Sequence, residues 1–404
     1  MKPKRKSGGN AADVIHSLPE LQDYDPKHFL CCHGSLDGEK RKNTKVWDCA
    51  FEPNVHKPGE TGTILATCGG NTVCFIDVLT GMVMKRFKDT DKAESFYTLA
   101  WTTLQGDEKK TNVLAAAGEG SAIKLIYPDQ LVCYSTIRGH RKYISCLVFH
   151  DKSPNLLFSG SKDGFIMLWN IGAPDSEGTV NHSPLLKLKM SDSIGDALCM
   201  AFNDRLGTLM AVTEKGCVGW SLGKVSALSD SHKTRVLNKH NFSFSHPKCG
   251  SDVETVDSLV ALDNGLVATK CVGSGEILVW SLDDHVRSAG GSKKEIQVKP
   301  LLHLQFPATS VKYINMAYVN GVLGVGDDEG NIHLYDLGEA VKTSATSSVS
   351  LLPASRVIEW PAVENLTQEE AKATVVMNTV ALTSDLTIVA GGTDNNLVCV
   401  WQQT

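Results

Sequence analysis

The sequence lacks the motifs that mark most enzymes, metal proteins and membrane proteins. Its 404 residues contain no Cys-x-x-Cys pair, no Gly-x-Ser-x-Gly motif, no phosphate-binding Walker loop and no histidines and cysteines at zinc-binding spacing. It also has no signal-peptide core and no apolar run of about 18 residues, the length that crosses a bilayer. We therefore expect an intracellular, non-enzymatic protein with no cofactor, no metal, no membrane contact and no small-molecule substrate.

The sequence also has few aromatic residues and only a small net charge. Aromatic residues make up 7% of the chain, and the formal net charge is −5, so bulk charge does not indicate a nucleic-acid-binding protein. Several of the twelve cysteines, including Cys68, Cys74 and Cys146, lie inside apolar, strand-like runs. Cysteines in this setting are typical of small buried hydrophobic residues in a reducing compartment.

A local basic cluster stands at the N-terminus, formed by Lys2, Lys4, Arg5 and Lys6. Such clusters act as nuclear localisation signals or contact phosphates. The alternative is a solvated, disordered terminus. We assign residues 1–25 to a disordered basic tail and residues 26–404 to a folded domain, and the cluster favours a location in the nucleus.

One pattern of short strands and turns recurs along the chain, and Gly139–Asn170 is its clearest copy. The copy opens with Gly139-His140, continues through two apolar runs to the turn Lys162-Asp163-Gly164, and closes on Trp169-Asn170. The Asp-Gly pair suits a tight hairpin turn. This Gly-His to Trp-Asp signature, with Asn in place of the final Asp, is that of a WD-repeat blade.

In such a blade, a histidine, a serine, an aspartate and a tryptophan form a hydrogen-bonded structural set. The predicted members here are His140, Ser159 (or Ser161), Asp163 and Trp169. We expect these residues to hold the blade together, so we do not interpret them as a catalytic His-Asp-Ser arrangement.

Weaker copies of the same rhythm bring the number of blades to seven. The first apolar runs of the copies are Val46–Phe51, Tyr97–Trp101, Tyr143–Phe149, Leu198–Phe202, Val256–Leu262, Tyr313–Tyr318 and Met377–Leu382. The seventh copy ends at its third run, and an open blade edge is a pairing hazard. We therefore predict an all-β, seven-bladed propeller, closed by the strand-like segment 28–32 as the outer strand of the last blade.

Four segments between the blades are long and polar: 175–182, 224–251, 283–299 and 339–373. We expect surface loops there, because propellers commonly carry function in such loops. A capping-type threonine, Thr367, predicts a short helix over 366–373.

Three aromatic residues stand where the first strand of a blade begins, near the rim of the central channel. They are Trp47, Tyr97 (with Phe96 beside it) and Tyr313 (directly after Lys312). Rings that converge at a rim can enclose a quaternary ammonium group by cation–π attraction. The alternative is ordinary packing between blades, which the spacing alone favours.

Several segments outside the generic repeat pattern carry a family resemblance. They are 28–30, 47–53, 66–70, 73–77, 113–118, 326–331 and 376–380. Over about residues 26–404 the sequence resembles the WD-repeat region of the leucine-rich-repeat and WD-repeat-containing protein 1 family, the origin-recognition-complex-associated proteins. The resemblance implies recruitment or stabilisation of the origin recognition complex on heterochromatin for DNA replication. No leucine-rich repeats precede the propeller in this sequence, so contacts made through them are not carried over.

A more distant resemblance, to the embryonic-ectoderm-development family of Polycomb WD-repeat subunits, rests on segments 96–101 and 151–171. That family reads trimethyl-lysine on histone tails with an aromatic cage at one end of the propeller channel. The matching motifs imply a cage at Trp47, Tyr97 and Tyr313, with Lys312 in place of a fourth aromatic. The resemblance therefore moves the balance from packing to a methyl-lysine cage.

The expected function is that of a chromatin scaffold whose partners are methylated histone tails and subunits of the origin recognition complex. Lys2–Lys6 and Lys40–Lys45 are candidate direct contacts with DNA, which salt would weaken. Two alternatives stay open. One is a Polycomb-like scaffold that clasps a helix of a methyltransferase in a groove, and the other is a general protein-interaction propeller.

Overall fold

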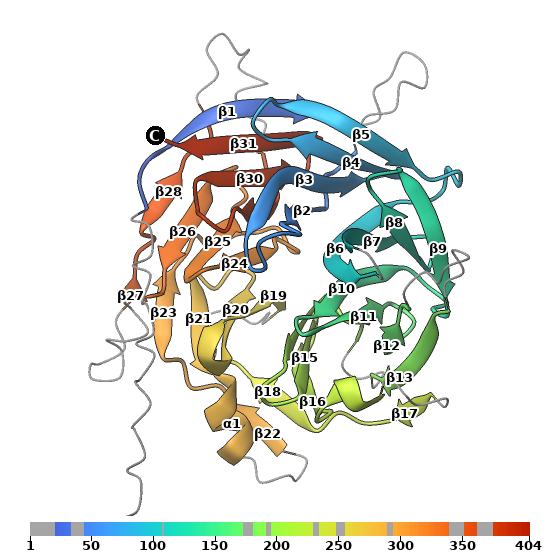
Figure 1. Ribbon diagram of the computed structural model, residues 1–404. Coiled ribbons are helices and arrows are strands. Elements are labelled where there is room, and N and C mark those ends of the chain that lie inside the picture. Colours follow the sequence, from blue (N-terminus) through green and yellow to red (C-terminus); the bar gives the residue numbers. More distant parts are fainter. Residues whose placement is uncertain are drawn as a thin grey trace, which may run out of the picture.

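Seven sheets, each built around four antiparallel strands, surround a central channel in the computed structural model (Figure 1). The described residues are 21–33, 44–106, 109–172, 181–190, 195–228, 234–247, 255–288, 294–338, 351–361 and 375–404. The prediction of an all-β, seven-bladed propeller is therefore confirmed. None of the helices in the described part of the chain has the length and hydrophobicity needed to cross a bilayer.

Each blade is a meander whose strands follow one another from the channel outward. Blade 1 comprises β2 (Asp48–Pro53), β3 (Thr61–Gly69), β4 (Thr72–Asp77) and β5 (Met82–Lys88). Blade 2 comprises β6 (Phe96–Gln105), β7 (Lys110–Gly118), β8 (Ala122–Tyr127) and β9 (Val132–Arg138). Blade 3 comprises β10 (Ile144–His150), β11 (Ser153–Ser161), β12 (Phe165–Asn170) and β13 (Ser183–Lys189). Blade 4 comprises β14 (Cys199–Asn203), β15 (Thr208–Thr213), β16 (Gly216–Ser221) and β18 (Phe242–Ser245). Blade 5 comprises β19 (Val256–Ala261), β20 (Leu266–Cys271), β21 (Glu276–Ser281) and β23 (Leu302–Gln305). Blade 6 comprises β24 (Met316–Val319), β25 (Val322–Gly326), β26 (Ile332–Asp336) and β28 (Arg356–Ile358).

Blade 7 joins the two ends of the sequence. Its three inner strands are β29 (Met377–Leu382), β30 (Ile388–Thr393) and β31 (Leu397–Gln403), and its outer strand is β1 (Tyr24–Cys31). β1 pairs antiparallel with β31, with Tyr24 opposite Gln403 and Cys31 opposite Leu397. The predicted closure by the upstream segment is confirmed, and it leaves β31 with a partner on both sides. β1 begins inside the segment expected as a tail, while the basic cluster at residues 2–6 lies outside the described residues.

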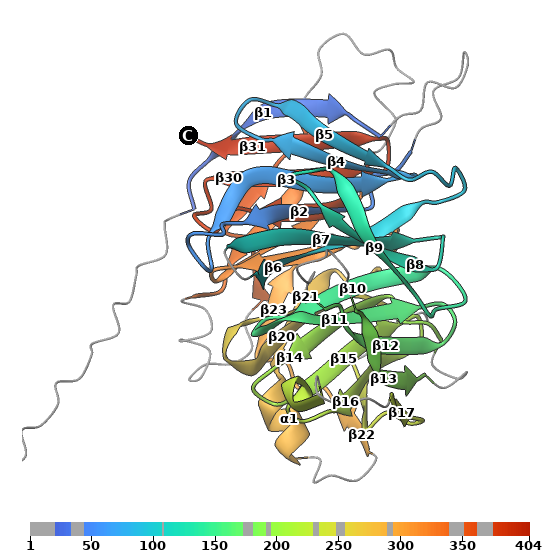
Figure 2. The ribbon, with the colours of Figure 1, turned by 45° about the vertical axis from the view of Figure 1, so that its right-hand side comes forward.

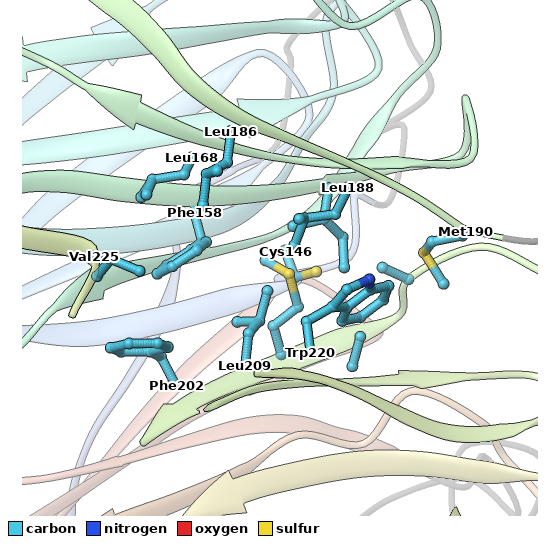
Figure 3. Close-up of a cluster of buried hydrophobic side chains, with 14 of the residues drawn as sticks. Cys146, Phe158, Leu168, Leu186, Leu188, Met190, Phe202, Leu209, Trp220 and Val225 are labelled. Atoms are coloured by element: carbon cyan, nitrogen blue, oxygen red, sulfur yellow. The ribbon is translucent and has the colours of Figure 1, made fainter. Parts of the chain in front are cut away.

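The core lies between neighbouring blades, because each sheet buries its apolar side chains against the next sheet. Figure 3 shows one such layer, where Phe158 and Leu168 of blade 3 face Phe202, Leu209 and Trp220 of blade 4. The third strands of four blades carry a tryptophan that is at most 2% exposed: Trp169, Trp220, Trp280 and Trp401. Truncating a buried tryptophan to alanine typically costs about 3–5 kcal/mol, so these rings are major contributors to the fold.

The long polar segments hold more regular structure than the sequence predicts. Three of them send a short strand back to pair in parallel with the outer strand of the preceding blade: β17 (Arg235–Leu237) on β13, β22 (Lys294–Gln297) on β18, and β27 (Leu351–Leu352) on β23. The remaining elements are η1 (Val225–Leu228), η2 (Asp263–Gly265) and the helix α1 (Leu282–Ser288). Figure 2 shows α1 and β22 together at the edge of the ring farthest from β1 and β31. The helix expected over 366–373 lies outside the described residues.

Candidate functional site

The innermost strands of neighbouring blades contact one another around the channel, which holds a cavity of about 390 Å³. Its lining includes Asp48 and Thr379 beside Tyr97, Ser145 and Met316. The walls therefore combine apolar and polar groups drawn from many blades. A channel of this kind presents an annular rim where the first strand of each blade begins.

Aromatic rings from three successive blades contact each other at this rim. The rings of Trp47 and Tyr97 have centroids 5.5 Å apart and an interplanar angle of 80°. The rings of Tyr97 and Tyr143 have centroids 5.8 Å apart at 87°. Both pairs have the edge-to-face geometry that aromatic quadrupoles favour. Trp47 and Tyr97 are thus brought together as expected, and Tyr143 extends the row.

The rings occupy two repeating positions in the blades. Trp47 and Tyr97 directly follow a fully buried residue, whereas Tyr143 and Tyr313 directly precede one. In blades 2 and 3 the strand pairing shifts register beside the buried residue, which marks a β-bulge. Bulges redirect side chains at the ends of strands. These bulges lie beside Tyr97 and Tyr143, whereas Trp47 also packs against the hydrophobic layer between blades 1 and 2.

Tyr313 reaches the rim through an unusual backbone conformation. Its φ angle is 68°, in the left-handed region that side chains other than glycine seldom adopt. Its backbone N–H donates to the Asp257 carboxylate at 3.0 Å, and its hydroxyl donates to Glu214 at 3.0 Å. The residue is 39% exposed. Polar contacts at both ends of the residue therefore hold an exposed aromatic side chain in one place.

Carboxylates anchor the hydroxyl groups of two rim tyrosines. The Tyr97 hydroxyl donates to Glu119 at 2.8 Å, as that of Tyr313 does to Glu214. Burial and the neighbouring carboxylate raise the pKa of both phenols to about 12. The Tyr143 phenol adds to the upward pKa shift of both, so it lies within electrostatic range of each. We call Trp47, Tyr97, Tyr143 and Tyr313 the aromatic rim.

Two rings of the aromatic rim already have an ammonium group over them. The Nζ atom of Lys45 lies 5.3 Å from the centroid of the Trp47 ring, and that of Lys162 lies 5.2 Å from the Tyr143 ring. Distances under about 6 Å are typical of cation–π contacts. Cations can therefore reach these ring faces, which two lysines of the same chain contact in this structure.

The two residues expected beside the cage have different surroundings. Phe96 is fully buried and packs against Phe87 at 6.4 Å, so it belongs to the layer between blades 1 and 2 and not to the rim. Lys312 is exposed next to Tyr313. Adjacent residues of a strand point to opposite faces, but the sequence does not tell which of the two faces the channel.

The four residues predicted to hold a blade together, His140, Ser159, Asp163 and Trp169, form a connected group of hydrogen bonds in blade 3. We call them the blade set. His140 Nδ1 lies 3.1 Å from the Asp163 carboxylate, and its Nε2 lies 2.7 Å from Ser159 Oγ. The indole N–H of Trp169 donates to the same Ser159 oxygen at 2.8 Å. Ser159 and Trp169 are buried, so the serine oxygen is enclosed by the blade. Ser161 instead donates to the carbonyl oxygen of Lys142.

Tyr143 is the rim residue that the sequence prediction missed. The signal was present, because Lys142-Tyr143-Ile144 and Lys312-Tyr313-Ile314 are identical triplets at equivalent positions of two blades. Glu119 and Glu214 were also missed, since each lies in the turn between the second and third strands of a blade, where acidic residues are common. Their role depends on hydrogen bonds across 22 and 99 residues of sequence.

Solved structures of a Polycomb complex contain a chain with a similar fold. A chain of the structure described as a humanized mutant of the Chaetomium thermophilum Polycomb Repressive Complex 2 bound to the inhibitor GSK126 gives a TM-score of 0.73 at 13% identity, covering 95% of this chain and 98% of that one. A Drosophila melanogaster relative, Polycomb protein esc, is 38% identical over 137 residues, which is 33% of this chain and 31% of the relative.

Longer matches identify the family. The human protein called leucine-rich repeat and WD repeat-containing protein 1 is 33% identical over 403 residues, and its mouse counterpart is 32% identical over 411 residues. These matches cover 98% and 99% of this chain but 60% of each relative, so the chain spans less than two thirds of their length. The family model described as the WD domain of leucine-rich repeat and WD repeat-containing protein 1 matches residues 16–404, and the chain accordingly belongs to that family.

Proposed function

We propose that this propeller is a chromatin scaffold that binds trimethylated lysine of histone tails at the aromatic rim. The observation that carries the proposal is the edge-to-face row of Trp47, Tyr97 and Tyr143. Tyr313 makes no ring contact with this row among the described residues, and Glu214 and Asp257 hold it in place. A trimethylammonium group is less hydrated than an ammonium group, so it is easier to desolvate against ring faces.

The surrounding charges support a cationic ligand. Glu119 and Glu214 accept hydrogen bonds from rim tyrosines, and the nearby Asp196 carboxyl lies within electrostatic range of Glu214. These carboxylates offset the charges of Lys45, Lys162 and Lys312 at the rim and can pair with basic residues of a histone tail. Lys45 and Lys162 show that ammonium groups settle over these rings.

The wider role is proposed from the family resemblance and not from the rim. We propose that the protein acts in the nucleus and recruits or stabilises the origin recognition complex on heterochromatin for DNA replication. The same assignment makes it a binding platform without catalytic activity. The blade set supports this reading, because Ser159 is wholly buried and its oxygen already accepts the indole N–H of Trp169, so no substrate can reach it.

The test is a calorimetric titration of the purified chain with histone-tail peptides that are unmethylated or trimethylated at the repressive lysines. The proposal predicts binding that depends on methylation. Trp47→Ala, Tyr97→Ala and Tyr313→Ala should each weaken it about tenfold or more, and Tyr143→Ala should also weaken it. Equal affinity for methylated and unmethylated tails would reduce the role to that of a scaffold.

Two matched variants separate ring contacts from damage to the fold. Tyr97→Phe keeps the ring and loses only the hydroxyl that donates to Glu119, so it should retain most of the affinity. Tyr127→Ala removes a tyrosine at the far end of β8 and should leave binding unchanged. A separate pull-down with origin recognition complex subunits tests the recruitment part of the proposal.

A further inference from the structure

Three side chains with metal-binding atoms meet where the propeller ring closes. Cys32 and His33 directly follow β1, the outer strand of blade 7, and Cys74 lies in β4 of blade 1. The two thiol sulfurs and a ring nitrogen of His33 lie within 4.8 Å of one another, and all three residues are buried. Within the described residues no other three histidine, cysteine or acidic side chains gather in this way.

His33 differs from the blade histidine His140 in what its second nitrogen faces. Its Nε2 lies 2.8 Å from Thr67 Oγ1, much as His140 Nε2 lies 2.7 Å from Ser159. In blade 3 the Nδ1 atom of the histidine meets the Asp163 carboxylate, but His33 Nδ1 faces the sulfur of Cys74 at 4.0 Å. The hydroxyl contact thus orients the ring, and the nitrogen left for a partner is turned toward thiols.

The donor set and its spacing fit a zinc ion. Zinc binds thiolate sulfur at about 2.3 Å and imidazole nitrogen at about 2.0–2.1 Å in tetrahedral geometry, which separates its ligand atoms by roughly 3.5–4 Å. The 4.0 Å between His33 Nδ1 and Cys74 Sγ is at the upper end of that range. A ligating histidine normally bonds through its other nitrogen to a fixed polar group, and Thr67 supplies that group here.

Charge and burial agree with the same ion. Two thiolates and one divalent cation sum to zero, so the filled site would place no net charge in the core. Binding replaces two thiol protons by two zinc–sulfur bonds and adds one zinc–nitrogen bond. No electron transfer is involved, and the three side chains fill three of the four tetrahedral positions. The weak contact from the Cys74 thiol to the carbonyl oxygen of Cys32, at 3.4 Å, is the interaction that would be exchanged.

We propose that Cys32, His33 and Cys74 bind one zinc ion, which fastens the N-terminal strand to blade 1 and locks the ring. The pairing of β1 with β31 holds the strand to blade 7 only. Because Cys32 and His33 follow the outer strand of blade 7 and Cys74 lies in blade 1, a shared zinc ion would join the first and last blades directly. This inference depends on the contacts of ring closure and is independent of methyl-lysine binding.

The site also lies close to the segment that leads into β2 and includes Trp47. A Cβ atom at Gly69 would stand 2.4 Å from the carbonyl oxygen of Lys45 and 3.2 Å from Cγ of His33, so the ring of His33 packs close to this backbone. Zinc would therefore hold both the closing strand and the segment that leads into the aromatic rim.

The experiment measures zinc by mass spectrometry in untagged protein purified under reducing conditions without chelator. The expected content is about one zinc ion per chain, and Cys32→Ala and Cys74→Ala should each abolish it. Two controls are matched: Cys31→Ala removes the exposed neighbouring thiol, and Cys68→Ala removes a fully buried thiol of the same blade. Both controls should keep the metal.

A second arm uses the unaltered chain, because Cys74 lies wholly in the core. Removing metal with a chelator should lower the unfolding midpoint by several degrees and speed amide exchange in β1, and added zinc should reverse both changes. Cobalt(II) in place of zinc should give thiolate charge-transfer absorption. The proposal is overturned if the wild type retains no zinc, if the Cys32 and Cys74 variants retain it, or if unreduced protein carries a Cys32–Cys74 disulfide.

Discussion

Lys270 and Asp257 form an ion pair inside blade 5, with the lysine Nζ 2.7 Å from each carboxylate oxygen and both side chains wholly buried. One of these oxygens also accepts the backbone N–H of Tyr313. The pair therefore connects the core of one blade to an exposed ring of the aromatic rim. Breaking a buried pair leaves an uncompensated charge, which is far more costly than losing an exposed pair.

Lys270→Met should lower the free energy of unfolding by about 3–5 kcal/mol, because it strands the Asp257 carboxylate in the core. Urea denaturation followed by fluorescence measures the change. The double variant Asp257→Asn/Lys270→Met has no buried charge and keeps an acceptor for Tyr313, so it should lose much less stability. An equal loss in the single and double variants would mean that the charge is not the cause.

Lys45→Ala and Lys162→Ala should strengthen the binding of trimethyl-lysine peptides, since each removes an ammonium group that competes for a rim ring. An exposed cation–π contact is worth about 0.5–1 kcal/mol, so we expect roughly a two- to fivefold gain in affinity for each. Lys187→Ala is the control, because its Nζ lies 4.0 Å from the ring of Phe165 at another place in blade 3. Unchanged or weaker binding by both rim variants would contradict the account.

Asp48 should make stability depend on pH between about 4 and 6. Burial raises the pKa of its carboxyl to about 6, although the N–H groups of Leu99 and Cys49 lower it. The folded protein therefore holds a proton that the unfolded chain, with an ordinary pKa near 3.9, has released. The contribution of Asp48 to stability falls as pH rises through this window.

Asp48→Asn removes that dependence. The free energy of unfolding of the variant relative to wild type should therefore rise by roughly 2–3 kcal/mol from pH 4 to pH 6.5. Urea titrations of both proteins across this range provide the measurement. A difference that stays constant with pH would show that the Asp48 carboxyl titrates at its ordinary pKa.

Ser159→Ala should lower the free energy of unfolding by about 1–3 kcal/mol, because it removes the oxygen shared by His140 and the indole of Trp169. Peptide affinity should not change once the loss of folded protein is accounted for. Ser183→Ala, at the exposed start of β13 in the same blade, should have almost no effect on stability. A loss of peptide binding in the folded Ser159→Ala protein would connect the blade set to the ligand site.

The sequence predicts the parts of this fold that repeat locally. The Gly139–Asn170 copy indicates a blade because it holds the strand spacing, the turn residues and the final tryptophan of the signature within about thirty residues. The outer strand of blade 7 follows from a physical requirement, since β31 would otherwise leave an open edge. The short parallel strands β17, β22 and β27 escape prediction, because two to four residues carry no periodic signal.

Sites built from distant residues are harder to predict. Trp47, Tyr97 and Tyr313 stand out in the sequence because each lies at the start of a blade's first strand. Tyr143 lies in the strongest repeat, where an aromatic residue fits the ordinary strand pattern. The Cys32–His33–Cys74 cluster has no recognisable spacing, since 41 residues separate His33 from Cys74. It exists only because the ring brings the first strand back to blade 1.

The most direct test of the central claim compares two peptides that differ only in charge at the modified side chain. One carries trimethyl-lysine, and the other carries its neutral carbon isostere of the same shape. Desolvated cation–π contacts are worth about 2 kcal/mol or more, so the wild-type protein should bind the charged peptide roughly thirtyfold more tightly. Trp47→Ala should remove most of that preference. Equal affinity of the wild type for both peptides would contradict recognition of a cation by the aromatic rim.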